Sequence, residues 1–349
     1  MNPRCLVLIL AVSIALIAGP IQADLLYVVQ NNNVYSYDVS LGNASAVSAS
    51  RQTVLSGSPY LNNARDIVFD SAGNFYVSSL GGVGSNGWVT KFNASGAYVS
   101  TITELMNGPM TLAVNSANSL YVLNVGPHPA VVQYTSAGAV YGSIANLPDT
   151  PSSLAVSGAG NVYIGYYVDS GDRIRMYGPN MMPAGTINSH TNWNNGLAVN
   201  SDGNLYSIDS FGYVDVFSST GSFLTQFGTG NPNDLALAAF DSAGNLYVSS
   251  GNESVSIAMF STSGQYQYSW AAGAGVDGIA YGPAIVPEPS TYAMVISGMA
   301  VMGWQTLRGR RRRGQAVSSP LMCTCSAPDT ESPVTRPALD PHPAPTPSA

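Results

Sequence analysis

The chain has 349 residues, of which 45% are hydrophobic and 9% are charged, and its formal net charge is −7. Between residues 24 and 286, five basic residues stand against fifteen acidic ones, a balance of −10. Because an acidic surface repels phosphate backbones, nucleic acid is excluded as a partner. The same region contains no cysteine, which excludes disulfides and thiolate chemistry there.

Residues 1–23 predict a secretory signal peptide. Arg4 precedes a long apolar run, Pro20 interrupts it, and Ala23 offers a small residue at a cleavage point. Cys5 lies before the apolar run and not at a cleavage site, so a lipoprotein anchor is not expected. We therefore expect an exported protein whose mature chain begins at Asp24.

Residues 24–285 contain a repeat in which an apolar triplet, a polar turn with Gly-Asn, and a strand with tyrosine follow one another. The tyrosines recur at steps of 45, 42, 43 and 41 residues, at Tyr76, Tyr121, Tyr163, Tyr206 and Tyr247. Glycine and asparagine supply the positive φ that a hairpin turn requires. A second hairpin follows each tyrosine strand and brings each unit to four strands. This period is typical of propeller blades.

Both ends of this region are expected to complete one shared blade. Tyr27 occupies the repeat position, a fourth strand is expected near 51–56, and 42–50 is expected to be a loop. No inner strand precedes Tyr27, but residues 276–285 supply one. The sequence therefore predicts an all-β, six-bladed propeller of four-stranded blades, closed by its N- and C-terminal strands and free of amphipathic helices.

This repeat resembles that of the NHL and SMP-30-like propeller group, in which many members have six blades. The resemblance covers about residues 24–285, and its motif is short. SMP-30-type lactonases place a metal ion in the central channel and use a glutamate ligand. The resemblance therefore implies an alternative function as a metal-dependent, lactonase-like hydrolase or a lyase at the channel mouth.

Candidate ligands for such a metal occur where the inner strands begin. Three carboxylates and one amide of this kind suit Ca²⁺, which takes oxygen ligands, and they are Asp66, Asn195, Asp234 and Asp277. The competing interpretation, which we favour, is that they cap turns and bind backbone N–H groups. Neither Glu104 nor Glu253 lies at the start of an inner strand.

No catalytic residue is assigned. His128 lies in a Gly-Pro-His-Pro loop, His190 has no evident paired acid, and no GxSxG elbow occurs. The repeat tyrosines could form a carbohydrate-binding stripe, but their identical placement favours packing between blades. Glycosylation sequons occur at Asn43, Asn93 and Asn252.

The stretch from Val286 to Arg313 predicts a sorting signal. It begins with Pro287, Glu288 and Pro289, continues with an uncharged run from Ser290 to Leu307, and ends in a basic cluster of Arg308, Arg310, Arg311, Arg312 and Arg313. The run is long enough for a transmembrane helix, and the arginines favour the cytoplasmic side. An ordinary single-pass anchor is the alternative.

This order of parts resembles the PEP-CTERM signal of Gram-negative bacteria, which an exosortase recognises and removes. The resemblance implies an inner-membrane-tethered precursor that later reaches the cell surface or extracellular matrix. Residues 314–349 continue beyond the usual end of such signals with eight prolines and no apolar period, which predicts disorder. This extension is either a natural appendage or the product of a shifted reading frame.

Together these features favour a non-enzymatic binding or structural module. The polar and mostly uncharged composition suits contact with polysaccharide or surface proteins. The PEP-CTERM resemblance implies a link to exopolysaccharide and biofilm.

Overall fold

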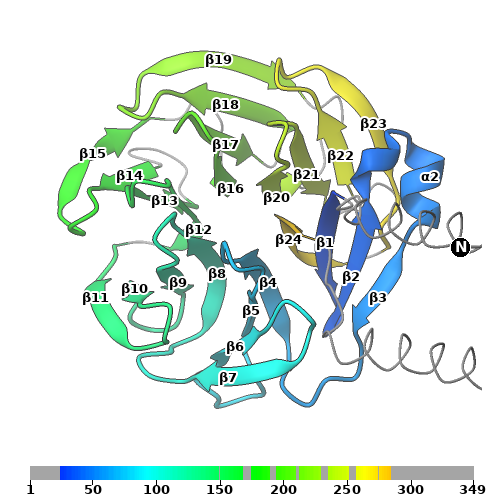
Figure 1. The fold of residues 1–349 in the computed structure, drawn as a ribbon. Helices are drawn as coiled ribbons and strands as arrows, with labels where there is room; N and C mark the ends of the chain where they lie inside the picture. The colour runs from blue at the N-terminus through cyan, green and yellow to red at the C-terminus, as the bar shows by residue number, and fades with distance from the viewer. Residues whose placement is uncertain are drawn as a thin grey trace, which may run out of the picture. The chain divides into compact units, whose positions relative to one another are not determined.

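The computed structural model describes residues 24–148, 150–167, 174–188, 194–209, 212–228, 235–250, 257–273 and 275–283. All of them belong to one compact unit. They form six antiparallel four-stranded sheets, which surround a common centre as the blades of a propeller (Figure 1). The predicted all-β, six-bladed fold is therefore confirmed.

Each blade is numbered here in chain order, and its strands are named first to fourth from the centre outward. Blade 1 consists of β24 (Val276–Gly282), β1 (Leu25–Gln30), β2 (Asn33–Asp38) and β3 (Gln52–Leu55). Blade 2 consists of β4 (Ala64–Phe69), β5 (Phe75–Ser79), β6 (Trp88–Phe92) and β7 (Tyr98–Ile102). Blade 3 consists of β8 (Pro109–Val114), β9 (Leu120–Asn124), β10 (Ala130–Tyr134) and β11 (Val140–Ile144).

The remaining blades repeat this pattern. Blade 4 consists of β12 (Pro151–Val156), β13 (Val162–Tyr166), β14 (Ile174–Tyr177) and β15 (Pro183–Ile187). Blade 5 consists of β16 (Asn194–Val199), β17 (Leu205–Asp209), β18 (Tyr213–Phe217) and β19 (Phe223–Gly228). Blade 6 consists of β20 (Leu235–Phe240), β21 (Leu246–Ser250), β22 (Ile257–Phe260) and β23 (Tyr266–Trp270).

The turn between the first and second strands has a recurring local cause. In blade 2, the Asp70 carboxylate accepts hydrogen bonds from the backbone N–H groups of Ala72 and Asn74, at 3.0 and 2.9 Å. Gly73 then adopts φ +78°, a conformation that glycine reaches without strain. Asp241 and Gly244 repeat this arrangement in blade 6. The Gly-Asn signal therefore marked real turns.

Burial falls from the middle of each blade to its outer edge. Every residue of β5 is buried, whereas four of the five residues of β15 are exposed. Buried hydrophobic side chains form six clusters, one between each pair of neighbouring blades. Because burial of apolar area is the main favourable term in folding, blade-to-blade packing is the principal stabilising contact.

The repeat tyrosines belong to these clusters, which confirms the packing interpretation. Tyr76 and Tyr247 are at most 2% exposed, and Tyr27, Tyr121 and Tyr163 are similarly buried. Their hydroxyl groups form hydrogen bonds at the turns. For example, Tyr247 Oη donates to Asp241 Oδ2 at 3.2 Å. Burial raises the pKa of the Tyr76 and Tyr163 hydroxyls, which keeps them neutral donors.

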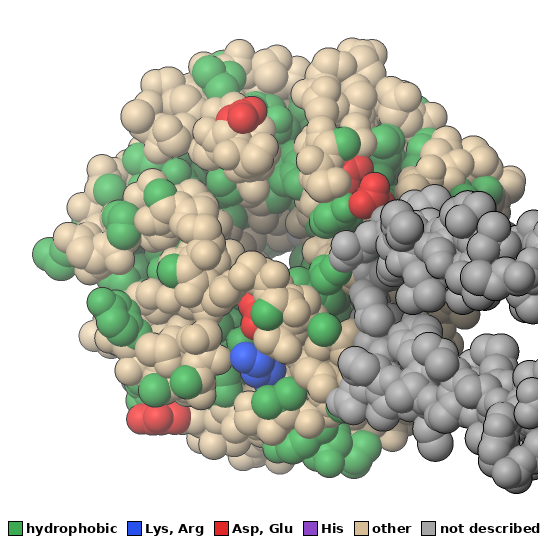
Figure 2. Space-filling view, in the orientation of Figure 1, with side chains coloured by type: hydrophobic (Ala, Val, Ile, Leu, Met, Phe, Trp, Pro, Cys, Tyr) green, Lys and Arg blue, Asp and Glu red, His purple; other side chains and the backbone are tan. Residues whose placement is uncertain are grey.

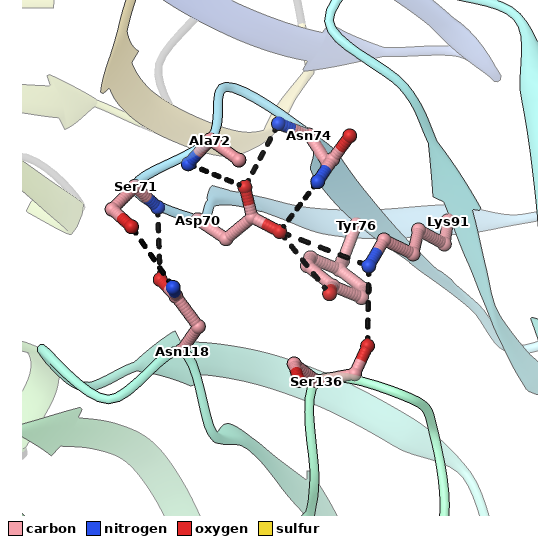
Figure 3. Close-up of polar contacts among 8 residues, drawn as sticks. All are labelled: Asp70, Ser71, Ala72, Asn74, Tyr76, Lys91, Asn118 and Ser136. Carbon is pink, nitrogen blue, oxygen red and sulfur yellow. Dashed lines mark hydrogen bonds and ion pairs between the residues drawn. The ribbon is translucent and has the colours of Figure 1, made fainter.

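Polar contacts also join blade 2 to blade 3, as Figure 3 shows. Lys91 Nζ lies 3.8 Å from Asp70 Oδ2 and donates a hydrogen bond of 3.2 Å to the Ser136 carbonyl oxygen in the next blade. Ser71 and Asn118 form a reciprocal pair of 2.9 Å hydrogen bonds between the two first turns. Lys91 is the single lysine of the sequence.

Ring closure occurs as predicted, with β24 pairing antiparallel to β1. Tyr27 Oη donates to the Pro283 carbonyl oxygen at 2.6 Å, which fixes the end of the last strand. Gly278 is required at this junction, because a Cβ there would lie 2.7 Å from Asp66 Cα in β4. Strand β24 ends at Gly282, slightly before the predicted end near residue 285.

One prediction was wrong. Residues 42–50, expected to be a loop, contain the short helix α2 (Ala44–Ala49). Asn43 caps it, because its Oδ1 accepts from the Ala46 backbone N–H at 2.9 Å. Val47 is fully buried and belongs to the cluster that contains Trp270 of β23. Tertiary packing therefore stabilises a segment with no helical period.

Among the described residues, no helix is long and apolar enough to cross a membrane. The signal peptide, the sorting segment from Val286 to Arg313 and the proline-rich extension lie outside the described residues.

Candidate functional site

The centre of the propeller holds a small cavity of about 90 Å³. Polar groups from Asp66, Thr111, Ser153 and Asn195 line it together with apolar side chains of the same inner strands, including Leu112, Leu154, Leu197, Leu237 and Ile279. A space of this size, lined by polar groups, has room for several ordered water molecules.

Asp66, on β4, is the one carboxylate that lines this cavity among the described residues. Its Oδ1 accepts from the backbone N–H of Ile67 and its Oδ2 from that of Leu112 on β8, both at 2.8 Å. The side chain therefore joins blade 2 to blade 3. Burial raises the pKa of Asp66 to about 7, and the two backbone hydrogen bonds partly oppose this shift.

The other predicted ligands do not join Asp66 as a set. Asn195 lines the same cavity, but Asp277 is not among its lining residues. Asp277 Oδ1 lies 3.3 Å from Arg65 Nη1, and its Oδ2 accepts from the Asn31 backbone N–H at 3.4 Å. Burial raises the pKa of Asp277, while Asn31 and the charge of Arg65 lower it. Asp234 lies outside the described residues.

These contacts fit a structural role better than a Ca²⁺ site. Ca²⁺ takes six to eight oxygen ligands, whereas the described part of the cavity offers one carboxylate, already engaged by two backbone donors. The described residues contain no group of three or more His, Cys, Asp or Glu side chains that could hold a metal ion. The four-residue Ca²⁺ site stays a prediction, because Asp234 lies outside the described residues.

A second candidate site lies on the outside of blade 2. Tyr60, in the loop before β4, stacks on Tyr98 of β7 with ring centroids 4.0 Å apart and planes at 16°. The two side chains are 39% and 43% exposed. Trp88 Nε1 donates to the Tyr60 carbonyl oxygen at 2.8 Å, and Thr90 Oγ1 donates to the same oxygen at 3.0 Å. These bonds hold the tyrosine loop against the sheet.

Sequence reasoning missed this tyrosine pair and the pairing of Arg65 with Asp277. Tyr60 belongs to no repeat, and Tyr98 lies on an outer strand, so no periodic signal links them. His128 is exposed, and His190 lies outside the described residues. Asn43 acts as a helix cap, Asn93 Oδ1 accepts from the backbone N–H groups of the turn that follows it, and Asn252 is not placed.

Comparison with known families identifies one segment. The PEP-CTERM protein-sorting motif matches residues 286–313, which confirms the predicted sorting signal with its boundaries. The motif implies a protein that is exported and processed at the membrane by an exosortase. No curated protein sequence matches the chain.

Comparison with solved structures bears on the propeller. A protein of unknown function from Bacteroides caccae has a TM-score of 0.57 at 10% identity, with coverage of 74% of this chain and 99% of that one. Virginiamycin B lyase from Staphylococcus aureus has a TM-score of 0.52 at 10% identity, covering 70% and 82%. A gluconolactonase from Xanthomonas campestris has a TM-score of 0.48 at 16% identity, covering 66% and 84%. At 10% identity, the likeness to the first two structures shows the propeller fold alone.

Proposed function

We propose that this exosortase-sorted propeller acts at the cell surface or in the extracellular matrix of a Gram-negative bacterium as a non-enzymatic binding module for neutral polysaccharide. The sorting motif supports delivery outside the cytoplasm. The link to exopolysaccharide and biofilm belongs to the same proposal. Other surface proteins are the second class of partner.

The observation that carries the proposal is the exposed tyrosine pair, Tyr60 and Tyr98. Aromatic rings offer an apolar face and, in tyrosine, a hydroxyl that hydrogen-bonds. A sugar ring matches both, since it has an apolar C–H face and a rim of hydroxyls. Thr101 Oγ1 donates to Tyr98 Oη at 3.3 Å, which orients that hydroxyl at the edge of the pair.

The outer edge of the propeller, which includes Tyr98 on β7, suits an uncharged ligand. The outer strands β3, β7, β11, β15, β19 and β23 contain no Asp, Glu, Lys or Arg. Their polar side chains are serine, threonine, glutamine and tyrosine, which donate and accept hydrogen bonds without a charge to desolvate.

Binding to purified matrix polysaccharide tests this proposal. The propeller, residues 24–285, should migrate more slowly in gels that contain the polysaccharide, and the double variant Y60A/Y98A should lose at least about 1.4 kcal/mol, a tenfold loss of affinity. Tyr213→Ala is the matched control, because Tyr213 is 48% exposed on β18, far from the pair in the sequence. Equal binding by both variants, or no binding by the unaltered protein, would reject the proposal.

The alternative is a hydrolase or lyase at the channel mouth. The favouring observation is the Asp66 carboxyl, whose pKa of about 7 would suit proton exchange at neutral pH. Against it, both carboxylate oxygens accept backbone hydrogen bonds. Elemental analysis of the purified protein tests the metal form, since a bound calcium ion that Asp66→Asn removes would favour this alternative.

A further inference from the structure

The chain leaves the propeller on one identifiable face, here called the turn face. This face carries the turns that join first to second and third to fourth strands, since successive antiparallel strands place both turns at the same end. Lys91 links the two kinds of turn directly (Figure 3). It contacts Asp70, in the turn between the first and second strands of blade 2, and Ser136, in the turn between the third and fourth strands of blade 3.

Pro283, the last described residue, lies on the turn face. It lines a pocket with Asp24 and with Ser71 and Ser242, which belong to the first turns of blades 2 and 6. Both ends of the propeller, at Asp24 and Pro283, therefore lie beside these turns.

The connection from Pro283 to the uncharged run of the sorting segment is short. Six residues, 284–289, separate it from Ser290, where the uncharged run begins. The seven steps from Pro283 to Ser290 span at most about 25 Å when the chain is fully extended. In the tethered precursor, this length is the upper limit on the distance between the exit point on the turn face and the start of the uncharged run.

Exposed apolar side chains occur, one or two per blade, at the outer edge of the same face. They occupy the beginnings of the fourth strands or the turns just before them, and we call those of blades 3 to 6 the rim cluster: Tyr141, Met182, Phe223, Leu224 and Tyr266. Their exposed fractions lie between 46% and 73%. Figure 2 shows hydrophobic side chains at several places around the outer edge of the blades.

We propose that the rim cluster rests on the lipid surface while the precursor is tethered, so that the propeller lies with its turn face on the bilayer. Aromatic side chains with a polar tip favour the membrane interface. The fourth strands carry no charge, and the acidic side chains of the same face, such as Asp202 and Asp241, lie in the first turns. Removal of the sorting segment would free the rim cluster. This inference rests on the sorting motif and not on polysaccharide binding.

Fluorescence quenching in vesicles tests the contact on the full-length chain. The native cysteines are replaced by serine, and the environment-sensitive dye NBD is attached at Phe223→Cys or at Tyr213→Cys. These two positions lie at opposite ends of the β18–β19 hairpin and are 46% and 48% exposed, so they form a matched pair. Vesicles contain phosphatidylethanolamine, phosphatidylglycerol and a lipid with a nitroxide on its headgroup.

We expect blue-shifted emission and at least threefold stronger quenching at position 223 than at position 213. Raising the salt concentration should not weaken the quenching, because the contact is apolar and salt screens only the repulsion between the acidic turns and the anionic lipid. A second pair, Tyr141→Cys and Met110→Cys in blade 3, repeats the comparison if the first variants fold poorly. Equal quenching within both pairs would overturn the proposal. So would a blue shift at 223 that grows with protein density without lipid quenching, which would assign the rim cluster to contacts between copies of the chain.

Discussion

Asp66 makes the stability of the propeller depend on pH in a calculable way. Its pKa rises from 3.8 to about 7 on folding, so the native state holds the proton more tightly than the unfolded chain. The stabilisation is fully present below pH 3.8 and is lost as the pH rises through about 7. Three pKa units at 1.36 kcal/mol each give about 4 kcal/mol. Asp277 adds to this loss with the same sign.

Urea unfolding of residues 24–285 between pH 4 and pH 8 measures the effect. The Asp66→Asn variant lacks the titrating group, and its amide N–H₂ opposes one of the backbone donors that Asp66 accepts. It should therefore be less stable than the unaltered protein by about 1–3 kcal/mol at pH 4. The gap should shrink by about 4 kcal/mol and close or reverse by pH 8.

The matched control for this experiment is Asp202→Asn, which alters an exposed aspartate in the first turn of blade 5. It should keep the pH profile of the unaltered protein. A gap between the unaltered protein and Asp66→Asn that stays constant from pH 4 to pH 8 would refute the reasoning, because it would mean that the buried carboxyl does not titrate in this range.

Three further predictions concern the junctions between blades. Asn194→Ala should lower the free energy of unfolding by about 2–4 kcal/mol in urea titrations, because this fully buried amide bonds to serines of blades 4 and 5. Lys91→Met should lower the free energy of unfolding by about 1–3 kcal/mol in the same assay, because the Asp70 side chain, which is only 4% exposed, loses its cation. A decrease below about 0.5 kcal/mol would contradict this prediction. Deleting residues 276–283 should cost more than about 5 kcal/mol and abolish cooperative thermal unfolding, whereas deleting 286–349 should leave the melting curve unchanged.

The blades could be predicted because each repeats the same physical requirements. A positive φ in the turn, as at Gly73 and Gly244, and a tyrosine that packs between blades after it leave a signal that recurs along the chain. Ring closure could be predicted by counting strands. The first blade lacked an inner strand before β1, and residues 276–285 formed one strand more than the last blade required. Helix α2 left no such signal, because its stability comes from Val47 packing against blade 6.

The candidate sites were harder to predict because they depend on contacts between positions distant in the sequence. Asp66 and Asp277 both lie near the start of inner strands but one position apart in the repeat. Asp66 accepts hydrogen bonds from backbone N–H groups of its own and the next blade, whereas Asp277 pairs with Arg65. Tyr60 and Tyr98 likewise meet only because a loop folds back over β6 and β7.

Cell fractionation tests the central claim most directly, namely that the sorting segment delivers this propeller to the cell surface or matrix. The unaltered chain should be found shortened and bound to the surface or matrix fraction. The chain that lacks Val286–Arg313 should keep its propeller and appear in the medium, because it retains the signal peptide but no sorting segment. Unchanged retention of the deleted chain, together with an unprocessed full-length chain, would contradict the account.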